Sequence, residues 1–386
     1  MEPYLWIIIL SILGFFLLVT IYLAWIRYIH GKGVMGPYLV KVPGESQDYR
    51  IQYKDNKHLP RLKVKESNGW TIIEEERFSG LVSSFLLKNL KGNSNIPYTL
   101  EDSKTGKNIF KGEVNTLNHD SSFKRFSFMA MSDVQIQDIY AVFQHWFKVV
   151  IKNQKPDFII ECGDLVSKVI LLRFRVFFNM FRGVLSKIPI FYTGGNHDYD
   201  PDDGRTLRQL GLIPTEESGY WYWFRNGPVY FIALSTNHMK NEKDFDEETR
   251  WLELTLKELN GKAKCIIIFF HYAVHGPDYS VSRPDAMKIQ EEILRSRWVP
   301  LFEKHDKVKL VINGHKHVYS RTVKNDIVYQ IVGSFQGVRK YPKARDGDEI
   351  TLNKHAVIKV VVEEEKLTIL AYDLLGRIFD RKTIPI

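Results

Sequence analysis

The heptapeptide Gly194–Asp200, with the sequence GGNHDYD, concentrates an amide, an imidazole and two carboxylates within seven positions. It follows the apolar run at residues 188–193, which has the pattern of a buried strand. Amide, imidazole and carboxylate groups are the side chains that bind divalent cations and transfer protons. The stretch therefore predicts a reactive loop at the end of a strand.

Four other apolar runs end in polar side chains of the same kinds. Their endings are Ser132-Asp133-Val134-Gln135, Gly163-Asp164, His271 and Asn313-Gly314-His315-Lys316-His317. In open α/β sheets, ligands bind at the carboxyl ends of strands, because loops converge there while the sheet holds them rigid. Each ending alone could be a helix cap, a turn or a satisfied surface histidine. Five such endings at one predicted edge are better explained by a shared metal site.

The chemistry of these groups suits a pair of divalent cations. Oxygens from Asp133 and Asp164 and nitrogens from three histidines favour borderline ions such as Mn, Fe, Zn or Co. The histidines are His271, His315 and His317. Two ions sharing one carboxylate would clamp both oxygens of an in-line displacement at phosphorus and lower the pKa of a bridging water toward neutrality. The pattern predicts hydrolysis of phosphate esters by that hydroxide.

His197 is not needed as a ligand in this scheme. Beside Asn196 it is placed to donate a proton to the leaving alkoxide. We expect Asp198 to orient the His197 imidazole. His197 and Asp198 are thus the candidate catalytic pair.

The elements that must position these residues follow an alternating strand and helix pattern from Phe123 onward, which indicates a layered α/β domain. The expected strands are 126–131, 158–162, 188–193, 229–234, 265–270 and 308–312, and the expected helices are 137–152, 168–187, 247–260 and 285–305. Between residue 35 and residue 120, short alternating stretches separated by Gly, Asn, Asp and Pro clusters predict a small β-sandwich.

Residues 5–26 form an uncharged apolar run. At ~1.5 Å per residue a helix of this run is roughly 33 Å long, enough to cross the hydrocarbon core of a bilayer. A cleaved signal peptide would begin with basic residues and contain a shorter apolar segment, whereas the only early charge here is Glu2. We expect an uncleaved single-pass anchor, so a membrane is a predicted partner through residues 5–26.

The amino-acid composition further limits the class of protein. The chain has 386 residues, of which 44% are hydrophobic and 26% charged, which excludes a disordered protein. Its net charge of +9 favours anionic partners such as phosphate esters or anionic lipid. Cys162 and Cys265 lie in apolar strand-like runs and indicate no disulfide framework.

The ordered set D-x-Q, GD, GNHD, H and GHKH resembles the calcineurin-like metallophosphoesterases over residues 123–386. The resemblance implies an α/β (α+β) fold, a four-layer β-sandwich flanked by helices. It implies that Asp164 bridges two metals and that His197 is the substrate-contacting, proton-donating histidine. The implied ligands are Asp133 and His317 for one ion and Asn196, His271 and His315 for the other, and Gln135 occupies the position of a further ligand of the first ion.

Further segments are similar to the purple acid phosphatase-like branch of that family. They are Gly36–Leu39, Thr249–Glu253, Gly314–Thr322 and Val332–Gly337. The implied organisation is a transmembrane anchor at 1–33, a fibronectin type III-like β-sandwich at 34–120 and the metallophosphoesterase domain at 123–386. Arg27 and Lys32 after the span favour a cytoplasmic catalytic domain, whereas the resemblance implies an exported one, and we favour the exported side.

Two residues depart from the family pattern. Gln135 stands where a histidine is usual, and Ser167 stands where the purple enzymes have a tyrosine. An amide carbonyl binds metal more weakly than an imidazole, so the first ion is expected to bind loosely or to be Mn, Fe or Mg rather than Zn. Without the tyrosine phenolate the protein should not be purple.

The segment 168–188 is rich in apolar and basic residues and contains no acid. This composition fits a core helix whose cations reach solvent, or a helix that docks on anionic lipid so that the site acts on membrane-held esters. The loop that contains Asn237 and His238 is expected at the surface.

Two other functions fit the sequence less well than a phosphatase or phosphodiesterase. A nuclease of the same superfamily would usually keep a histidine at position 135 and show a basic, aromatic tract, so nucleic acid is not the expected partner. A membrane-tethered binding or adhesion protein with a lapsed hydrolase site would have lost some ligands, and all are present. The sequence leaves the substrate, the choice between mono- and diesters and the oligomeric state open.

Overall fold

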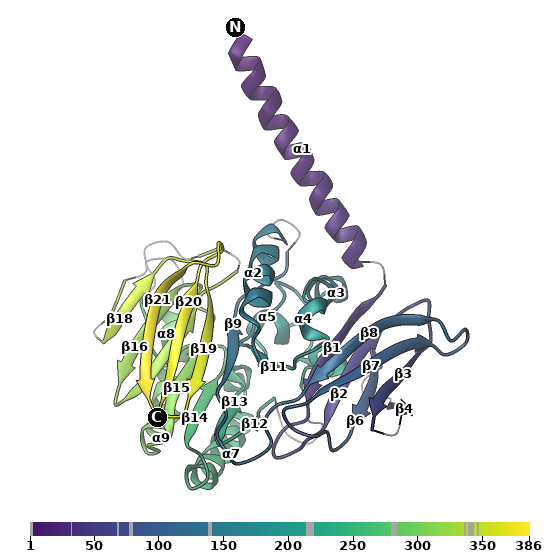
Figure 1. Ribbon diagram of the computed structural model, residues 1–386. Coiled ribbons are helices and arrows are strands. Elements are labelled where there is room, and N and C mark those ends of the chain that lie inside the picture. Colours follow the sequence, from purple (N-terminus) through teal and green to yellow (C-terminus); the bar gives the residue numbers. More distant parts are fainter. Residues whose placement is uncertain are drawn as a thin grey trace.

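The computed structural model describes residues 3–31, 33–67, 69–76, 80–137, 141–213, 220–278, 284–335, 337–338, 343–345 and 347–386. Three parts follow one another along the chain: a long N-terminal helix, an all-β unit and a larger α/β unit (Figure 1).

The N-terminal helix α1 (Pro3–Gly31) projects away from the rest of the protein (Figure 1). Its segment Tyr4–Trp25 has a mean hydropathy of 2.8, and no residue of its most apolar window is buried. The segment matches the expected span at 5–26 and is long and apolar enough to cross a membrane. Where α1 meets the body it contacts α2 (Ala141–Gln154) and α3 (Leu171–Met180).

The all-β unit consists of two four-stranded antiparallel sheets, as the strand pattern predicted. One sheet has the order β1 (Met35–Lys41), β2 (Tyr49–Lys54), β6 (Ser83–Leu87), β5 (Glu75–Glu76), and the other has the order β4 (Gly69–Ile73), β3 (Pro60–Glu66), β7 (Asn95–Asp102), β8 (Asn108–Asn115). Buried and less buried residues alternate along β3, because successive side chains of a strand point to opposite faces. Leu62, Val64, Phe85 and Leu100 meet in the core between the sheets.

The α/β unit contains two larger sheets. The first has the order β11 (Ile190–Tyr192), β10 (Phe158–Glu161), β9 (Phe126–Met131), β19 (Val357–Glu363), β20 (Lys366–Tyr372), β21 (Ile378–Pro385). The second has the order β12 (Tyr222–Asn226), β13 (Val229–Ala233), β14 (Cys265–Phe269), β15 (Val308–Asn313), β17 (Ile327–Val332), β16 (Tyr319–Lys324), β18 (Asp348–Leu352). The runs β9–β10–β11 and β13–β14–β15 are parallel.

Aromatic side chains hold the two larger sheets face to face. Phe158 of the first sheet packs edge to face on Phe231 of the second, with ring centroids 5.2 Å apart. Such a geometry favours contact between the positive edge of one ring and the negative face of the other. Cys162 and Cys265 are buried in this core and are not joined by a disulfide.

Helices cover the outer faces and complete the four predicted layers. On the first sheet lie α2, α3, α4 (Arg182–Leu185), α5 (Asn196–Tyr199) and α6 (Arg205–Gln209); on the second lie the 3-10 helix η1 (Thr236–Lys240), α7 (Glu242–Asn260), α8 (Pro284–Arg297) and α9 (Val299–Glu303). The expected strands and helices are confirmed to within about five residues, with two corrections. The helix expected at 285–305 is two helices, α8 and α9, divided at Trp298. The helix expected at 168–187 is two helices divided at Phe181, and its phenylalanines are core residues.

The two β-rich units share a core instead of being joined by a free linker. Strand β1 of the sandwich packs against α3, α4 and β11. The ring of Tyr38 stacks on that of Phe178, with centroids 3.8 Å apart. Asn179 of α3 donates to the carbonyl of Val34 at 2.6 Å and accepts from the backbone of Gly36 at 3.2 Å. These contacts fix the sandwich to the helix that follows the Asp164 loop.

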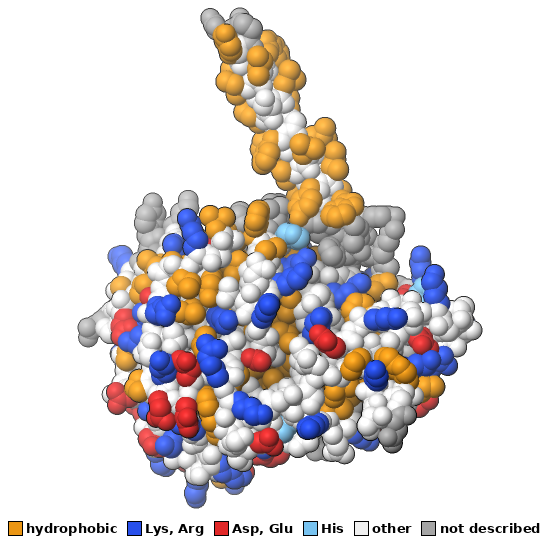
Figure 2. Space-filling view, in the orientation of Figure 1, with side chains coloured by type: hydrophobic (Ala, Val, Ile, Leu, Met, Phe, Trp, Pro, Cys, Tyr) orange, Lys and Arg blue, Asp and Glu red, His pale blue; other side chains and the backbone are white. Residues whose placement is uncertain are grey.

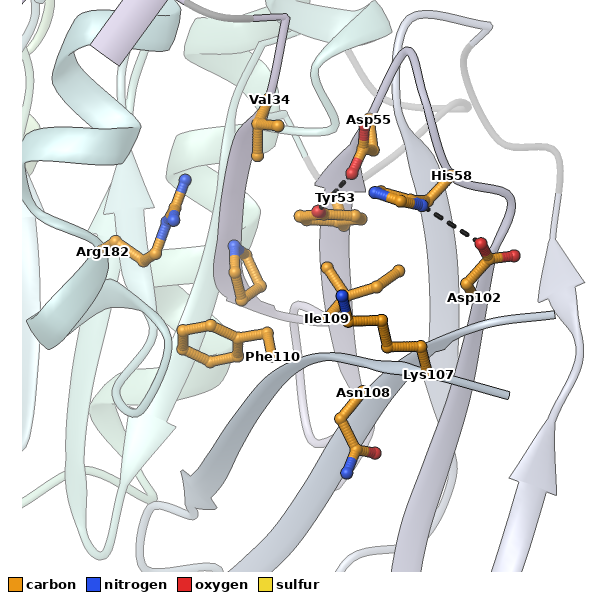
Figure 3. Close-up of a pocket in the computed structure, with 11 residues that line it drawn as sticks. Val34, Tyr53, Asp55, His58, Asp102, Lys107, Asn108, Ile109, Phe110 and Arg182 are labelled. Carbon is orange, nitrogen blue, oxygen red and sulfur yellow. Dashed lines mark hydrogen bonds and ion pairs between the residues drawn. The ribbon is translucent and has the colours of Figure 1, made fainter. Parts of the chain in front are cut away.

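A cavity of about 320 Å³ lies at this junction (Figure 3). It is lined by Val34, Pro37, Tyr53, Asp55, His58, Asp102, Lys107, Asn108, Ile109, Phe110 and Arg182. Arg182 lies across the cavity from Asp55 and Asp102, and Lys107 lies on the same side as Asp102 (Figure 3). The formal charges of its Lys, Arg and Asp residues balance. None of the predicted metal ligands lies in its wall.

The junction predicts a large effect of a core mutation on stability. Phe178→Ala should lower the free energy of unfolding by about 3–5 kcal/mol, because it removes a buried ring and leaves a cavity. Denaturant unfolding of the full chain in detergent measures this. Leu254→Ala, at a side chain that is 59% exposed, is the control. Similar values for both variants would contradict a shared core.

Candidate metal centre

The predicted site residues lie at the carboxyl ends of parallel strands from both sheets. Asp133 follows β9, Asp164 follows β10, and Asn196 and His197 follow β11. From the second sheet, His271 follows β14, and His315 and His317 follow β15. Because the two sheets face each other, their loops meet at one edge. Segments separated by nearly two hundred residues therefore contribute to one site.

Two groups of possible metal ligands occur there, and they share one residue. Asp164, His271 and His315 each offer an atom within 4.8 Å of the others, and so do Asp133, Asp164 and His317. His271 Nε2 lies 3.4 Å from Asp164 Oδ2, and His317 Nε2 lies 3.1 Å from Asp133 Oδ1. The position of Asp164 between the groups is the one that a bridging carboxylate requires.

The hydrogen bonds of the histidines suit metal ligation. His271 Nδ1 lies 2.7 Å from the Cys162 carbonyl, and His317 Nδ1 lies 3.0 Å from the Gly337 carbonyl. A carbonyl can only accept, so each Nδ1 carries the proton, and in a neutral ring Nε2 keeps its lone pair. Metal-binding histidines are commonly oriented in this way.

Several buried atoms at the site lack a hydrogen-bond partner among the described residues. They include Asn196 Oδ1, Asp133 Oδ1 and His315 Nε2. Burying a polar atom without a partner is unfavourable. A cation would satisfy all three atoms, so the donor set fits a metal centre.

The backbone at the site is strained. Asp133, Gln135, Asp164, His315 and His317 all have positive φ, between 41° and 67°. Residues other than glycine adopt this conformation at a cost, and it clusters at functional sites. The five residues with this strained backbone are all candidate ligands, and they lie together at the site.

Glycines allow the loops to approach one another closely. A Cβ atom on Gly195 would lie 2.1 Å from Asp164 Oδ1, and one on Gly314 would lie 1.7 Å from Ser132 Oγ. Only glycine fits at such distances. The glycines of the GNHD and GHKH motifs are thus required for packing around the two aspartates.

The charges of the buried groups are coupled. Burial opposes ionisation of Asp164, but His271 and the other nearby histidines hold its pKa below the ordinary value. Burial opposes protonation of His271, but the Asp164 carboxylate raises the pKa of His271 to about 9. Burial and the neighbouring His271 lower the pKa of His315 well below its ordinary value, so His315 is a neutral donor.

Gln135 lies where the resemblance placed it. Its side-chain nitrogen is 3.0 Å from Asp164 Oδ2 and 3.3 Å from His317 Nε2. The oxygen and nitrogen of an amide are exchanged by a flip, which would turn the Gln135 carbonyl toward the Asp133 and His317 group. Gln135 can therefore act as a weak ligand of that group.

The expected pair between Asp198 and His197 is wrong. Asp198 accepts hydrogen bonds from the backbone of Leu165, Val166 and Gly195 and from the Tyr192 hydroxyl. His197 Nδ1 instead lies 3.1 Å from the Ser167 carbonyl, and its Nε2 lies 3.9 Å from Asp164 Oδ2. Asp198 is completely buried. It ties the Asp164 loop to the GNHD loop, and a backbone carbonyl orients His197.

The structure also corrects the placement of Asn237 and His238. Both are buried, at 2% and 6% exposure, whereas a surface loop was expected. Asn237 Nδ2 donates to the Gly194 carbonyl at 2.8 Å, and His238 Nδ1 lies 3.1 Å from Glu248. Asn237 therefore holds the backbone just before the GNHD loop, and His238 joins η1 to α7. Two adjacent polar residues just after a buried strand were the available signal.

Glu161 is a site residue that sequence reasoning did not single out. It is fully buried at the end of β10 and accepts a hydrogen bond from the backbone of Gly163 at 2.9 Å. Burial raises the pKa of Glu161 well above its usual range. An acid at the end of the apolar run Phe158–Glu161 was the signal in the sequence.

The fold has two facing sheets covered by outer helices, and one carboxylate is shared by two groups of ligands. Together these features define the metallophosphoesterase class. The family model for calcineurin-like phosphoesterases matches residues 126–319, and the chain belongs to this family. The match begins at the first residue of β9 and ends just after the GHKH motif.

Solved structures are similar in fold. A purple acid phosphatase from yellow lupin (Lupinus luteus) seeds has a TM-score of 0.75 at 13% identity, covering 92% of this chain and 74% of its own. PhoD has a TM-score of 0.65 at 12% identity, covering 92% of both chains. A dimetal phosphatase from Danio rerio has a TM-score of 0.51 at 15% identity, covering 67% of this chain and 98% of its own.

The geometry at Gln135 predicts a change in metal affinity. Gln135→His should tighten the weaker of two Mn²⁺ sites about tenfold, because imidazole is a better ligand than an amide. Titration of the full-length protein with Mn²⁺, followed by calorimetry, measures both affinities.

Two variants serve as controls for this titration. Gln135→Ala should weaken the same site, and Asp164→Asn should abolish binding of the second ion because the shared carboxylate is lost. Equal affinities in the original protein, Gln135→His and Gln135→Ala would contradict the assignment of Gln135 as a ligand.

Proposed function

We propose that the protein is a membrane-anchored, dinuclear-metal-dependent hydrolase of phosphate esters. The observation that carries this proposal is the position of Asp164 between two groups of buried ligands. Two divalent ions bound there would supply Lewis acidity and a hydroxide nucleophile at neutral pH. Membership of the calcineurin-like phosphoesterase family supports the same reaction class.

In this proposal the chain's own side chains hold the two ions. Asp133 and His317 would hold one, His271 and His315 would hold the other, and Asp164 would contribute to both. Gln135, which lies beside His317, would join the first group, and Asn196, whose buried Oδ1 has no partner among the described residues, would join the second. Mn, Fe, Zn and Mg are the candidate metals, since the donors combine carboxylate, amide and imidazole. The carbonyls behind His271 and His317 keep the rings in the orientation that ligation needs.

His197 is the proposed general acid. Its side chain is 44% exposed, which leaves the ring accessible to substrate, and the Ser167 carbonyl fixes its Nδ1. During hydrolysis an oxygen from water bonds to phosphorus and the bond to the ester oxygen breaks. His197 Nε2 donates a proton to that departing oxygen.

The position of α1 supports attachment to a membrane. Tyr4–Trp25 projects from the body and offers an apolar surface of sufficient length. Without a membrane this apolar surface would be exposed to water, which is unfavourable. We therefore assign α1 as a single-pass anchor, with the catalytic unit on the exported side as the working hypothesis.

Metal-dependent activity tests the proposed reaction. Full-length protein purified in detergent should hydrolyse a phosphomonoester, a phosphodiester or both after loading with Mn²⁺, Fe²⁺, Zn²⁺ or Mg²⁺. Asp164→Asn should reduce the rate to background, because both ligand groups lose their shared residue. A metal-free, inactive protein with every ester and metal would refute the proposal and favour a lapsed site.

If His197 is the general acid, the loss of rate in a His197 variant should depend on the leaving group of the ester. His197→Ala should lower kcat about 100-fold for alkyl phosphate esters, whose leaving oxygens need a proton. The loss should be much smaller for a nitrophenyl ester, because nitrophenolate is a leaving group that departs without protonation. Metal content, measured by elemental analysis, should not change. Equal losses for both esters would argue against His197 as the acid.

A further inference from the structure

The candidate site faces the side of the protein from which α1 leaves. The C-terminus, at the end of β21, lies on the opposite side of the body from α1 (Figure 1). Strand β21 is antiparallel to β20, β20 to β19 and β19 to β9. Strand β9 therefore runs toward α1, and its parallel partner β10 does too. The loops that carry Asp133 and Asp164 follow the ends of these strands.

The connection between α1 and the body is short. Helix α1 ends at Gly31 and β1 begins at Met35. The four backbone steps from Gly31 to Met35 span at most about 14 Å. The start of β1 is bound to Asn179 of α3, and α3 begins seven residues after Asp164. A membrane crossed by α1 would consequently lie near the loop that carries the shared carboxylate.

The segment Lys168–Arg173, called the rim below, leads into the first turn of α3 and exposes apolar and basic side chains. Ile170 is 45% exposed and Lys168 is exposed. Arg173 Nη1 donates to Ser167 Oγ at 2.5 Å, and the Ser167 carbonyl contacts His197. This segment, Lys168–Arg173, thus joins the catalytic histidine to an apolar and basic surface.

A second exposed apolar surface lies on α2, which α1 also contacts. Trp146 is 50% exposed and Val149 is 37% exposed. In the space-filling view, the described side chains next to the base of α1 are mainly hydrophobic or basic, and acidic side chains lie farther away (Figure 2). Tryptophan and cations together are typical of surfaces at the membrane interface.

We infer that the substrate is a phosphate ester attached to a lipid, with the apolar part of the lipid held in the same membrane that α1 crosses. This inference rests on the proposed function. The rim Lys168–Arg173 contacts the bilayer and brings the metal centre to the level of the lipid phosphates. A lipid ester reaches the site by diffusion in the plane of the membrane, whereas a soluble ester must arrive from the aqueous phase.

The inference is tested with matched pairs of esters. Full-length protein is reconstituted in phosphatidylcholine vesicles and loaded with the metal that gives the highest rate. Phosphatidate is compared with glycerol 3-phosphate, and phosphatidylglycerol with glycerophosphoglycerol. In one pair or both, the acylated ester should be hydrolysed at least about tenfold faster at equal total concentration, because acyl chains partition into the bilayer.

A rim variant separates membrane contact from chemistry. Ile170→Asp should lower the rate on the acylated ester about tenfold, because it replaces an exposed apolar side chain, proposed to enter the bilayer, with a charge. The rate on p-nitrophenyl phosphate should not change, since Ile170 is neither a proposed metal ligand nor the proposed general acid. Leu254→Asp, on α7 at the far side of the body, is the matched control and should alter neither rate.

The outcomes distinguish the two proposals. Preference for the acylated ester together with its selective loss in Ile170→Asp supports a lipid substrate. Equal or faster hydrolysis of the soluble partners, with no effect of Ile170→Asp, overturns the lipid substrate and leaves the phosphoesterase intact. Failure to hydrolyse any ester, including p-nitrophenyl phosphate, refutes the proposed function itself.

Discussion

The burial of the Asp164 carboxylate is the constraint on which the rest of the site depends. A buried charge is costly unless it is paired and hydrogen-bonded. Here its Oδ1 accepts from the backbone of His197 at 2.9 Å, while Oδ2 faces His271 and Gln135. These partners come from loops after three different strands. The loops must therefore be held together by both sheets. The aromatic core between the sheets has to be rigid enough to fix the positions of the two sheets relative to each other.

The sequence predicted the layered fold and the convergence of the ligands. Both follow from local patterns, because apolar runs define strands and the types of the residues after them define the chemistry. Asp164 between His271 and His317 was an expectation from resemblance, and the geometry agrees with it. Period and residue type therefore located the edge at which the ligands converge, and the resemblance supplied their division between two ions.

Other features depended on contacts that local patterns do not contain. Asp198 binds the backbone of Leu165 and Val166, since two loops cross there, and nothing in the GNHD motif specifies that crossing. Asn237 and His238 looked like loop residues, but they are buried behind Gly194. Helices α3 and α4, on either side of the break at Phe181, both pack against β1 of the β-sandwich, a partner far away in sequence. Tertiary contacts decided each of these cases.

The stacking of Tyr38 on Phe178 has a consequence for how the protein can be divided. A fragment beginning at residue 123 would keep every proposed metal ligand but would lose β1, which covers the phenylalanines of α3. Those rings would then face water beside the loop of the shared aspartate, and such patches promote aggregation. The sandwich thus buries an apolar face of the α/β unit at all times. The two units would therefore have to be expressed, and moved into another protein, together.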